Sequence, residues 1–263
     1  MTPSLVATDA DGTLLDDHNM VSARTAAAVR RVVAGGVPFV LVSGRPVRTL
    51  GKIARRAGVD GLAVCSNGAV VYDLRRGRAL RVVTLAPPRL GAVLAAFDTH
   101  LPGCSFAAES IGAAAALRAE AGFRAAHPLV KCEAAARGEL VARPAVKLAV
   151  SCPAMTSPAL AGAAAALLGA AVSVTFSQHG GLVELAAPGV DKGSGLAWVA
   201  AHLGVGAETA VAFGDMPNDI PMLRWAGHGV AVANADPEVL RVAAEITASN
   251  VDDGVARVLE RWF

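Results

Sequence analysis

Two aspartates flank one alanine directly after the first apolar segment of the chain. The stretch reads LVATDADGT, so Asp9 and Asp11 follow a short apolar run and precede a Gly-Thr turn. Two carboxylates this close to apolar backbone repel each other unless a cation or a proton lies between them. The pattern therefore predicts a shared cation or proton, although a strand-to-turn transition with a capping aspartate would also produce it.

Polar residues also follow two later apolar runs. The stretch SGR at 43–45 comes after VPFVLV, and GDMPND at 214–219 comes after TAVAF. Ligands of an open parallel sheet bind outside the carboxyl ends of its strands, so we expect these stretches to meet in one crevice. The meeting would bring together Asp9, Asp11 and Asp215, whose oxygens suit Mg²⁺.

Each stretch taken alone has a simpler interpretation. Residues 43–45 are typical of a helix N-cap after a strand, and residues 214–219 of a turn followed by a cap. Lys192 lies in PGVDKGSG, where the lysine precedes the glycine, so the phosphate-loop pattern G-x-x-x-x-G-K-[ST] does not match. Alone, Lys192 would be a solvated side chain near a helix start. Together and in this order, the stretches are stronger evidence for a shared site than any one of them alone.

Strand-like and helix-like segments, which must position these residues, alternate in the N-terminal and C-terminal parts of the chain. Strand-like segments at 4–8, 37–42 and 62–65 are separated by helix-like segments, and the same rhythm returns between residues 193 and 262. This alternation predicts an α/β fold with a doubly wound parallel sheet.

The middle of the chain has a different pattern. Strand-like runs at 80–85, 146–151, 172–176 and 182–185 lie among Ala- and Gly-rich helical stretches. We therefore expect residues 1–79 and 188–263 to form a Rossmann-like core, and residues 80–187 to form an inserted α+β cap domain.

Composition narrows the class of protein. With 263 residues, of which 54% are hydrophobic and 17% charged, the chain is expected to be compact. A net charge of +2 with scattered basic residues argues against nucleic acid or an anionic membrane as a partner. Without a signal peptide or a Cys-x-x-Cys pair, we expect a cytoplasmic protein with reduced thiols and no membrane span.

The polar stretches together resemble the motifs of the haloacid dehalogenase-like (HAD) superfamily. The matching residues are Asp9-Ala10-Asp11-Gly12-Thr13, Ser43-Gly44-Arg45, Lys192 and Gly214-Asp215-Met216-Pro217-Asn218-Asp219. VSGR at 42–45, NGA at 67–69, GVDKG at 189–193 and DGV at 253–255 resemble the Cof-type subfamily. In the insert, the resemblance rests on position and size, as in members with a large α/β cap of class IIB type.

This resemblance implies a Mg²⁺-dependent phosphatase that forms an aspartyl-phosphate. Asp9 would attack phosphorus, and Asp11 would protonate the leaving group and then activate the hydrolytic water. Asp9, the backbone carbonyl of Asp11, and Asp215 would hold Mg²⁺, with Asp219 near the ion or supporting its ligands. An aspartate at position 11 favours phosphoryl transfer over dehalogenation.

The resemblance also implies how the substrate is held. Ser43, the amide of Gly44, Lys192 and Asn218 would bind the phosphoryl oxygens. Arg45 would either reach the substrate or pair with an acid beneath the crevice, and Asn67 is a further candidate for substrate contact. In the insert, a few polar residues are candidates for lining a pocket, although the simpler interpretation of each is a surface or strand-end residue: Glu109, Lys131, Lys147, His179 and Glu184.

The expected substrate is a small phosphate ester, most plausibly a sugar phosphate. A phosphomutase, which would return the phosphoryl group to a second hydroxyl, is an alternative on the same fold. A non-catalytic metabolite-binding protein is a further alternative, but it would not need the complete set of catalytic residues. The sequence does not specify the oligomeric state.

Overall fold

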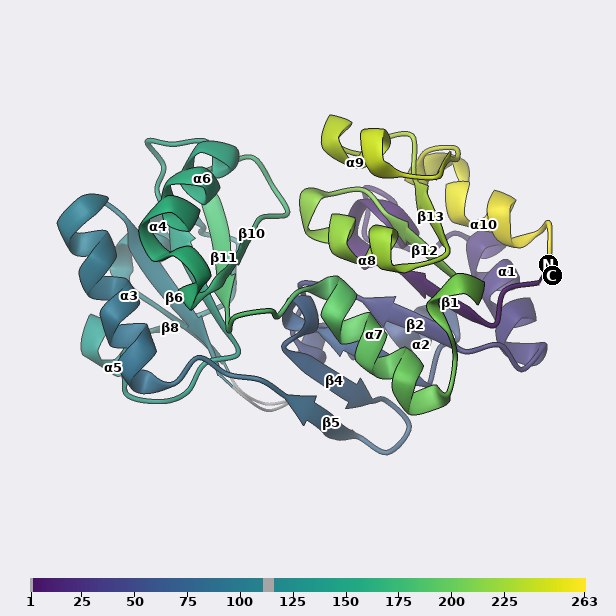
Figure 1. The fold of residues 1–263 in the computed structure, drawn as a ribbon, viewed down its shortest axis with the longest axis horizontal. Coiled ribbons are helices and arrows are strands. Elements are labelled where there is room, and N and C mark those ends of the chain that lie inside the picture. Colours follow the sequence, from purple (N-terminus) through teal and green to yellow (C-terminus); the bar gives the residue numbers. More distant parts are fainter. Residues whose placement is uncertain (1, 111–115) are drawn as a thin grey trace. The chain divides into compact units, whose positions relative to one another are not determined.

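The computed structural model describes residues 2–110 and 116–263, and the chain forms two compact units (Figure 1). The core unit contains both ends of the chain, up to Arg81 and from Asp191 to Phe263. The insert unit contains Val82–Val190. Each unit has its own sheet, as an independent hydrophobic core requires.

The core unit is built on an eight-stranded sheet in the order β14-β13-β12-β1-β2-β3-β4-β5. The strands from β14 to β3 are parallel, and β4 is antiparallel to β3. The expected α/β fold with a parallel sheet is confirmed. The bounds are β1 Leu5–Thr8, β2 Phe39–Val42, β3 Leu62–Cys65, β4 Val70–Asp73, β5 Arg78–Val82, β12 Ala210–Gly214, β13 His228–Ala231 and β14 Glu245–Ile246.

Helices cover both faces of this sheet. Every residue of β1, β2 and β12 is buried, as in parallel strands packed on both sides. Helix α1 packs with α2 and α10, while α7 packs with α8, which also contacts α9. The bounds are α1 Ala23–Ala34, α2 Val47–Ala57, α7 Lys192–Leu203, α8 Ile220–Trp225, α9 Pro237–Val242 and α10 Gly254–Leu259.

A capping box fixes the start of α7, where Lys192 is the first helical residue. The Asp191 carboxylate accepts a hydrogen bond from the amide of Ser194 at 2.6 Å, and the Ser194 hydroxyl accepts one from the amide of Asp191 at 3.0 Å. These bonds satisfy backbone donors that the first helical turn leaves free. The capping box therefore fixes the backbone position from which the Lys192 side chain extends.

The strand expected at 80–85 differs in extent and in its sheet. The structure has β5 at Arg78–Val82, as the last strand of the core sheet and not in the insert, and Leu85 makes only an isolated bridge to Ala145. The cause is a turn after β4: Asp73 accepts hydrogen bonds from the amides of Arg76 and Gly77, and Gly77 adopts a positive φ of 65°. This turn folds β5 back to the sheet edge.

The insert unit is built on a six-stranded sheet in the order β10-β11-β9-β6-β7-β8. Its neighbouring strands are antiparallel except for the pair β7 and β8. The bounds are β6 Ser105–Glu109, β7 Leu117–Ala119, β8 Glu133–Ala134, β9 Lys147–Ser151, β10 Ser173–Thr175, β11 Leu182–Ala186, α3 Pro87–His100, α4 Ala121–Ala126, α5 Arg137–Val141 and α6 Ser157–Leu168.

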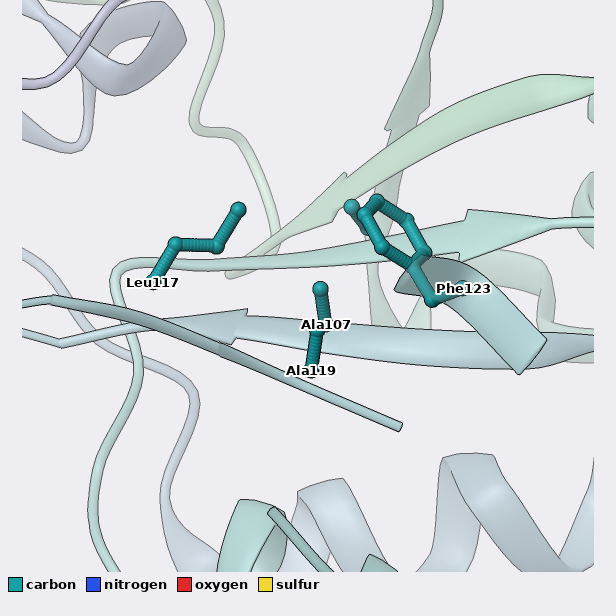
Figure 2. Packing of buried hydrophobic residues seen from close by; sticks show 5 residues of the cluster. Ala107, Leu117, Ala119 and Phe123 are labelled. Carbon is teal, nitrogen blue, oxygen red and sulfur yellow. The ribbon is translucent and has the colours of Figure 1, made fainter. Parts of the chain in front are cut away.

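Successive residues of β6 pack against different helices. Phe106 meets Phe97 of α3 edge-on, with ring centroids 5.6 Å apart. Ala107 lies opposite Ala119 of β7 and belongs to a buried cluster with Phe123 of α4 (Figure 2). Because neighbouring residues of a strand point to opposite faces, α3 and α4 cover opposite faces of the insert sheet.

The insert sheet also buries an ion triad. Lys147 of β9 lies directly opposite Glu109 of β6, and its Nζ is 3.3 Å from a Glu109 oxygen and 2.6 Å from a Glu184 oxygen. Burial would lower the pKa of Lys147, but the two carboxylates outweigh burial and raise it. These three residues are therefore partners of one another and not surface residues. Glu109 ends β6 and Lys147 begins β9, so both lie at strand ends, as the sequence also suggested.

Among the helices of residues 2–110 and 116–263, we find none with the length and apolar character needed to cross a bilayer.

Replacing Gly68 by alanine should destabilise the core unit. Gly68 ends the short turn η2 (Ser66–Gly68) with a φ of 98°, and a Cβ there would lie 2.0 Å from the carbonyl oxygen of Asp191. Strain and overpacking predict a loss of about 2–4 kcal/mol in the free energy of unfolding. Urea unfolding followed by tryptophan fluorescence measures this loss, since Trp198, Trp225 and Trp262 all lie in the core unit.

The matched control is Gly51→Ala in the middle of α2. The nearest atom to a Cβ at this position is a guanidinium nitrogen of Arg55 at 3.8 Å, and the backbone is helical. We expect no loss, or a gain of about 0.5–1 kcal/mol from the better helix former. Equal stability of the Gly68→Ala and Gly51→Ala proteins would contradict the close approach of η2 to α7.

Candidate active site

Two neighbouring parallel strands of the core sheet each end at an aspartate. Thr8 and Phe213 are paired residues of β1 and β12, and the amide of Asp9 donates a 2.9 Å hydrogen bond to the carbonyl of Phe213. Asp215 follows the last residue of β12. Because parallel strands end at the same edge of the sheet, Asp9 and Asp215 are brought side by side.

A third aspartate completes a buried carboxylate cluster. Asp9, Asp215 and Asp219 each offer one carboxylate oxygen, and these atoms lie within 4.8 Å of one another. Asp219 comes from the turn η5 (Pro217–Asp219), which follows β12 and leads into α8. Three carboxylates held this closely are costly unless positive charge lies among them.

Lys192 supplies part of that charge. Its Nζ lies 2.6 Å from an oxygen of Asp9 and 2.6 Å from an oxygen of Asp219, and only 1% of the residue is exposed. Burial would lower the pKa of Lys192, but Asp219 and Asp9 outweigh burial and raise it, so the ammonium stays charged. The structure thus shows Lys192 as an internal cation and not as the solvated side chain that the sequence also allowed.

Asp219 supports the cluster through both of its oxygens. Oδ1 accepts from Lys192, while Oδ2 accepts hydrogen bonds from the amides of Asp215 and Met216 at 3.0 and 3.1 Å. Asp219 therefore holds the backbone from which the Asp215 side chain extends. Pro217 lies in the same turn without disturbing these bonds.

Gly12 and Thr13 position Asp215 from the turn after β1. The Thr13 hydroxyl donates a 2.8 Å hydrogen bond to Oδ1 of Asp215. Gly12 has a φ of 74°, and a Cβ on it would lie 2.4 Å from Oδ2 of Asp215. No role was predicted for Gly12 or Thr13 from the sequence, although a Gly-Thr pair directly after Asp11 indicates such support.

The Asp11 carboxylate lies apart from the cluster of Asp9, Asp215 and Asp219. Its oxygens accept from Nε and Nη2 of Arg45, the former at 2.7 Å, and its side chain is 49% exposed. Arg45 also donates to the side chain of Asn19 at 2.6 Å. Arg45 thus pairs with the exposed Asp11 and not with an acid beneath the crevice, and its contact with the substrate stays a prediction. The metal contact expected of Asp11 was through its backbone carbonyl, and it stays a prediction.

Ser43, Asn67 and Asn218 form a connected group. The backbone amide of Asn67 donates to the Ser43 carbonyl at 3.1 Å. The side-chain nitrogen of Asn218 donates to Oδ1 of Asn67 at 3.2 Å. The Ser43 hydroxyl accepts from the amide of Arg45 at 3.1 Å, across Gly44. Oδ1 of Asn218 is buried and receives no hydrogen bond from the residues that the structure describes. Such an acceptor suits a cation or a donor group of a ligand.

Burial and excess negative charge both raise pKa values in the cluster. Burial, together with Asp219, Asp215 and Asp11, raises the pKa of Asp9 well above its usual range despite the opposing effect of Lys192. Burial and Asp219 raise the pKa of Asp215 to about 7. A further cation would relieve this cost, and carboxylate and amide oxygens fit a hard divalent ion such as Mg²⁺.

Two curated relatives match nearly the full chain. The 5-amino-6-(5-phospho-D-ribitylamino)uracil phosphatase YcsE of Bacillus subtilis (strain 168) is 26% identical over 260 residues, which cover 98% of this chain and 95% of the relative. The phosphoglycolate phosphatase of Methanothermobacter thermautotrophicus is 26% identical over 258 residues, which cover 98% of each protein.

Solved structures and a family model agree on the fold. The HAD subclass IIB sugar phosphatase BT4131 superposes with a TM-score of 0.83 at 18% identity and covers 98% of each chain. The model of the family described as haloacid dehalogenase-like hydrolase matches residues 6–259, which confirms the resemblance found in the motifs. The chain therefore belongs to the haloacid dehalogenase-like hydrolase family.

Proposed function

We propose that this hydrolase is a Mg²⁺-dependent phosphatase that hydrolyses a small phosphate ester through an aspartyl-phosphate on Asp9. The observation that carries the proposal is the buried carboxylate of Asp9, held at 2.6 Å by Lys192 beside Asp215 and Asp219. The curated relatives that span the chain are named phosphatases, in agreement with the phosphoric monoester hydrolase expected from the motifs.

Asp9 is suited to attack phosphorus because it is held in place. Lys192 fixes one of its oxygens, and the backbone of Asp9 is hydrogen-bonded to β12. Attack forms a bond between an Asp9 oxygen and phosphorus and releases the substrate alkoxide. Mg²⁺ bound by Asp9 and Asp215 would screen the carboxylate from the phosphate and stabilise the transferring charge. Lys192, Ser43, Gly44 and Asn218 would hold the phosphoryl oxygens.

Asp11 would move the protons in both half-reactions. It would give a proton to the leaving alkoxide, and then take one from the water that hydrolyses the aspartyl-phosphate. The ion pair with Arg45 holds Asp11 at the exposed rim of the core site. Proton transfer therefore requires Asp11 to exchange this contact for the substrate oxygen.

A sugar phosphate is the substrate class that we propose. The core site supplies groups for a phosphate and few for the rest of a substrate, so the insert, predicted as residues 80–187, would provide specificity. The two relatives are named as phosphatases of small phosphorylated compounds, and BT4131 is named a sugar phosphatase.

Replacing Asp9 by asparagine should abolish the Mg²⁺-dependent hydrolysis of p-nitrophenyl phosphate. The amide is not a nucleophile, so we expect kcat to fall by at least ~10³-fold. The matched control is Asp17→Asn, which makes the same change at an exposed aspartate nearby and should leave kcat unchanged. Full turnover by the Asp9→Asn enzyme would refute nucleophilic catalysis by Asp9.

Mg²⁺ should raise the Tm of the core unit through Asp215 but not through the side chain of Asp11. A Mg²⁺ concentration of ~100 times its Kd is expected to raise the Tm by about 5 °C or more. Thermal unfolding followed by tryptophan fluorescence measures this rise. Asp215→Asn should lose this rise because a ligand is removed. Asp11→Asn should keep it because the Asp11 carboxylate contacts Arg45 instead. The opposite pattern would contradict the ligand set.

A panel of phosphorylated sugars, polyols, nucleotides and hydroxy acids at fixed Mg²⁺ tests the substrate class. We expect free phosphate to be released from the substrates that are turned over, with the highest kcat/KM for a sugar phosphate. Accumulation of an isomeric sugar phosphate without free phosphate would instead indicate a phosphomutase. A preference for nucleotides or hydroxy acids would contradict the proposed class.

A further inference from the structure

Two cysteines lie opposite each other at one end of the central strands of the insert sheet. Strands β6 and β9 are antiparallel neighbours in the middle of the order β10-β11-β9-β6-β7-β8, and Ser105 is paired with Ser151. Continuing this register by one residue places Cys104 opposite Cys152.

The hydrogen bonds around this pair define its geometry. The amide of Cys152 donates to the carbonyl of Gly181 at 2.8 Å, so the backbone of Cys152 faces β11 and not β6. Phe106 of β6 lies two residues after Cys104, so both backbones face the same side. The backbone amide of Phe106 donates to the Glu120 carboxylate at 3.0 Å and thus points away from β9. In an antiparallel ladder, such residues form non-hydrogen-bonded pairs with Cα atoms about 4.5 Å apart. Disulfides span Cα separations of about 4.4–6.8 Å.

The thiols of this pair interact. Burial and the neighbouring Cys152, which also hydrogen-bonds to it, raise the pKa of the Cys104 thiol to about 12. Cys152 is buried and Cys104 is partly exposed, and both are free thiols in the structure. The same chain offers internal controls, since Cys65 lies in β3 of the core unit and Cys132 packs against the cluster of Ala107 and Phe123.

We propose that Cys104 and Cys152 are a site of reversible disulfide formation, which locks β6 to β9 when the protein meets a low-molecular-weight disulfide. The partly exposed Cys104 meets the oxidant first, and the buried Cys152 then displaces the small thiol. The cross-link joins the two central strands of the insert sheet.

The chemistry balances with that oxidant alone. The Cys104 thiolate attacks one sulfur of the small disulfide, whose S–S bond breaks and releases one small thiolate. The Cys152 thiolate then attacks the Cys104 sulfur of the mixed disulfide and releases the second small thiolate. The two cysteine protons end on the two released thiols. The protein thiols are oxidised and the small disulfide is reduced.

The high pKa of Cys104 predicts slow formation of the bond and a product that resists reduction. Only a small fraction of thiolate is available to attack, so exchange is slower than at an ordinary exposed cysteine. The reduced pair gains no stability from a thiolate form, so the disulfide is not a strong oxidant. These properties suit a lock on the sheet and not a catalytic dithiol.

Incubation of the whole protein with oxidised glutathione tests the proposal, followed by peptide mapping without reduction. We expect a peptide that joins Cys104 to Cys152, with Cys65 and Cys132 still as thiols, and restoration of all four thiols by dithiothreitol. Cys104→Ser should remove the cross-link, and Cys132→Ser should retain it. Persistence of four free thiols, glutathione retained on Cys104, or a cross-link through Cys65 or Cys132 would overturn the proposal.

Hydrogen exchange provides a second measurement on the wild-type protein, which needs no variant to fold. The tryptophans lie in the core unit and do not report on the insert, whereas peptides covering β6 and β9 do. Oxidation should slow the exchange of these amides by at least about tenfold, because the cross-link restricts the unfolded insert. Formation of the bond without slower exchange would overturn the locking role.

Discussion

The buried ammonium of Lys192 between Asp9 and Asp219 is the interaction on which the site depends. Removing one partner from a buried ion pair costs about 3–5 kcal/mol, because the other charge is left without compensation. Several features of the core unit place this ammonium: the capping box at Asp191, the first turn of α7, and the glycine of η2 that lets the carbonyl of Asp191 approach. Stability of the core and the chemistry of the site therefore share the same contacts.

The carboxyl edge of the parallel sheet places these charged side chains together, where a ligand can bind. Parallel pairing of β1 with β12 places Asp9 beside Asp215, and Asp219 holds the turn that carries Asp215. One lysine does not neutralise three carboxylates, and burial together with the remaining negative charge raises the pKa values of Asp9 and Asp215. A divalent cation would offset the excess carboxylate charge and would also bind Oδ1 of Asn218, an acceptor that receives no hydrogen bond from the residues that the structure describes.

The sequence was sufficient for features that depend on local pattern. Buried parallel strands read as continuous apolar runs, and polar residues at their carboxyl ends indicated where Asp9 and Asp215 would meet. Features set by tertiary pairing were harder to predict. The run 80–85 was apolar enough for a strand, but its sheet was decided by the turn at Gly77. The triad of Lys147 with Glu109 and Glu184 depends on the register of three strands, which alternation alone does not fix.

The most direct measurement of the central claim is the position of the phosphoryl group during turnover. The Asp11→Asn enzyme can be mixed with p-nitrophenyl phosphate and Mg²⁺, quenched in acid and mapped by mass spectrometry. The p-nitrophenolate leaves without a proton, so the loss of Asp11 should slow mainly the second half-reaction. The account predicts a phosphorylated peptide that contains residue 9, with the modification on Asp9. Phosphorylation at any other residue, or substrate turnover in which no phosphorylated peptide accumulates, would contradict it.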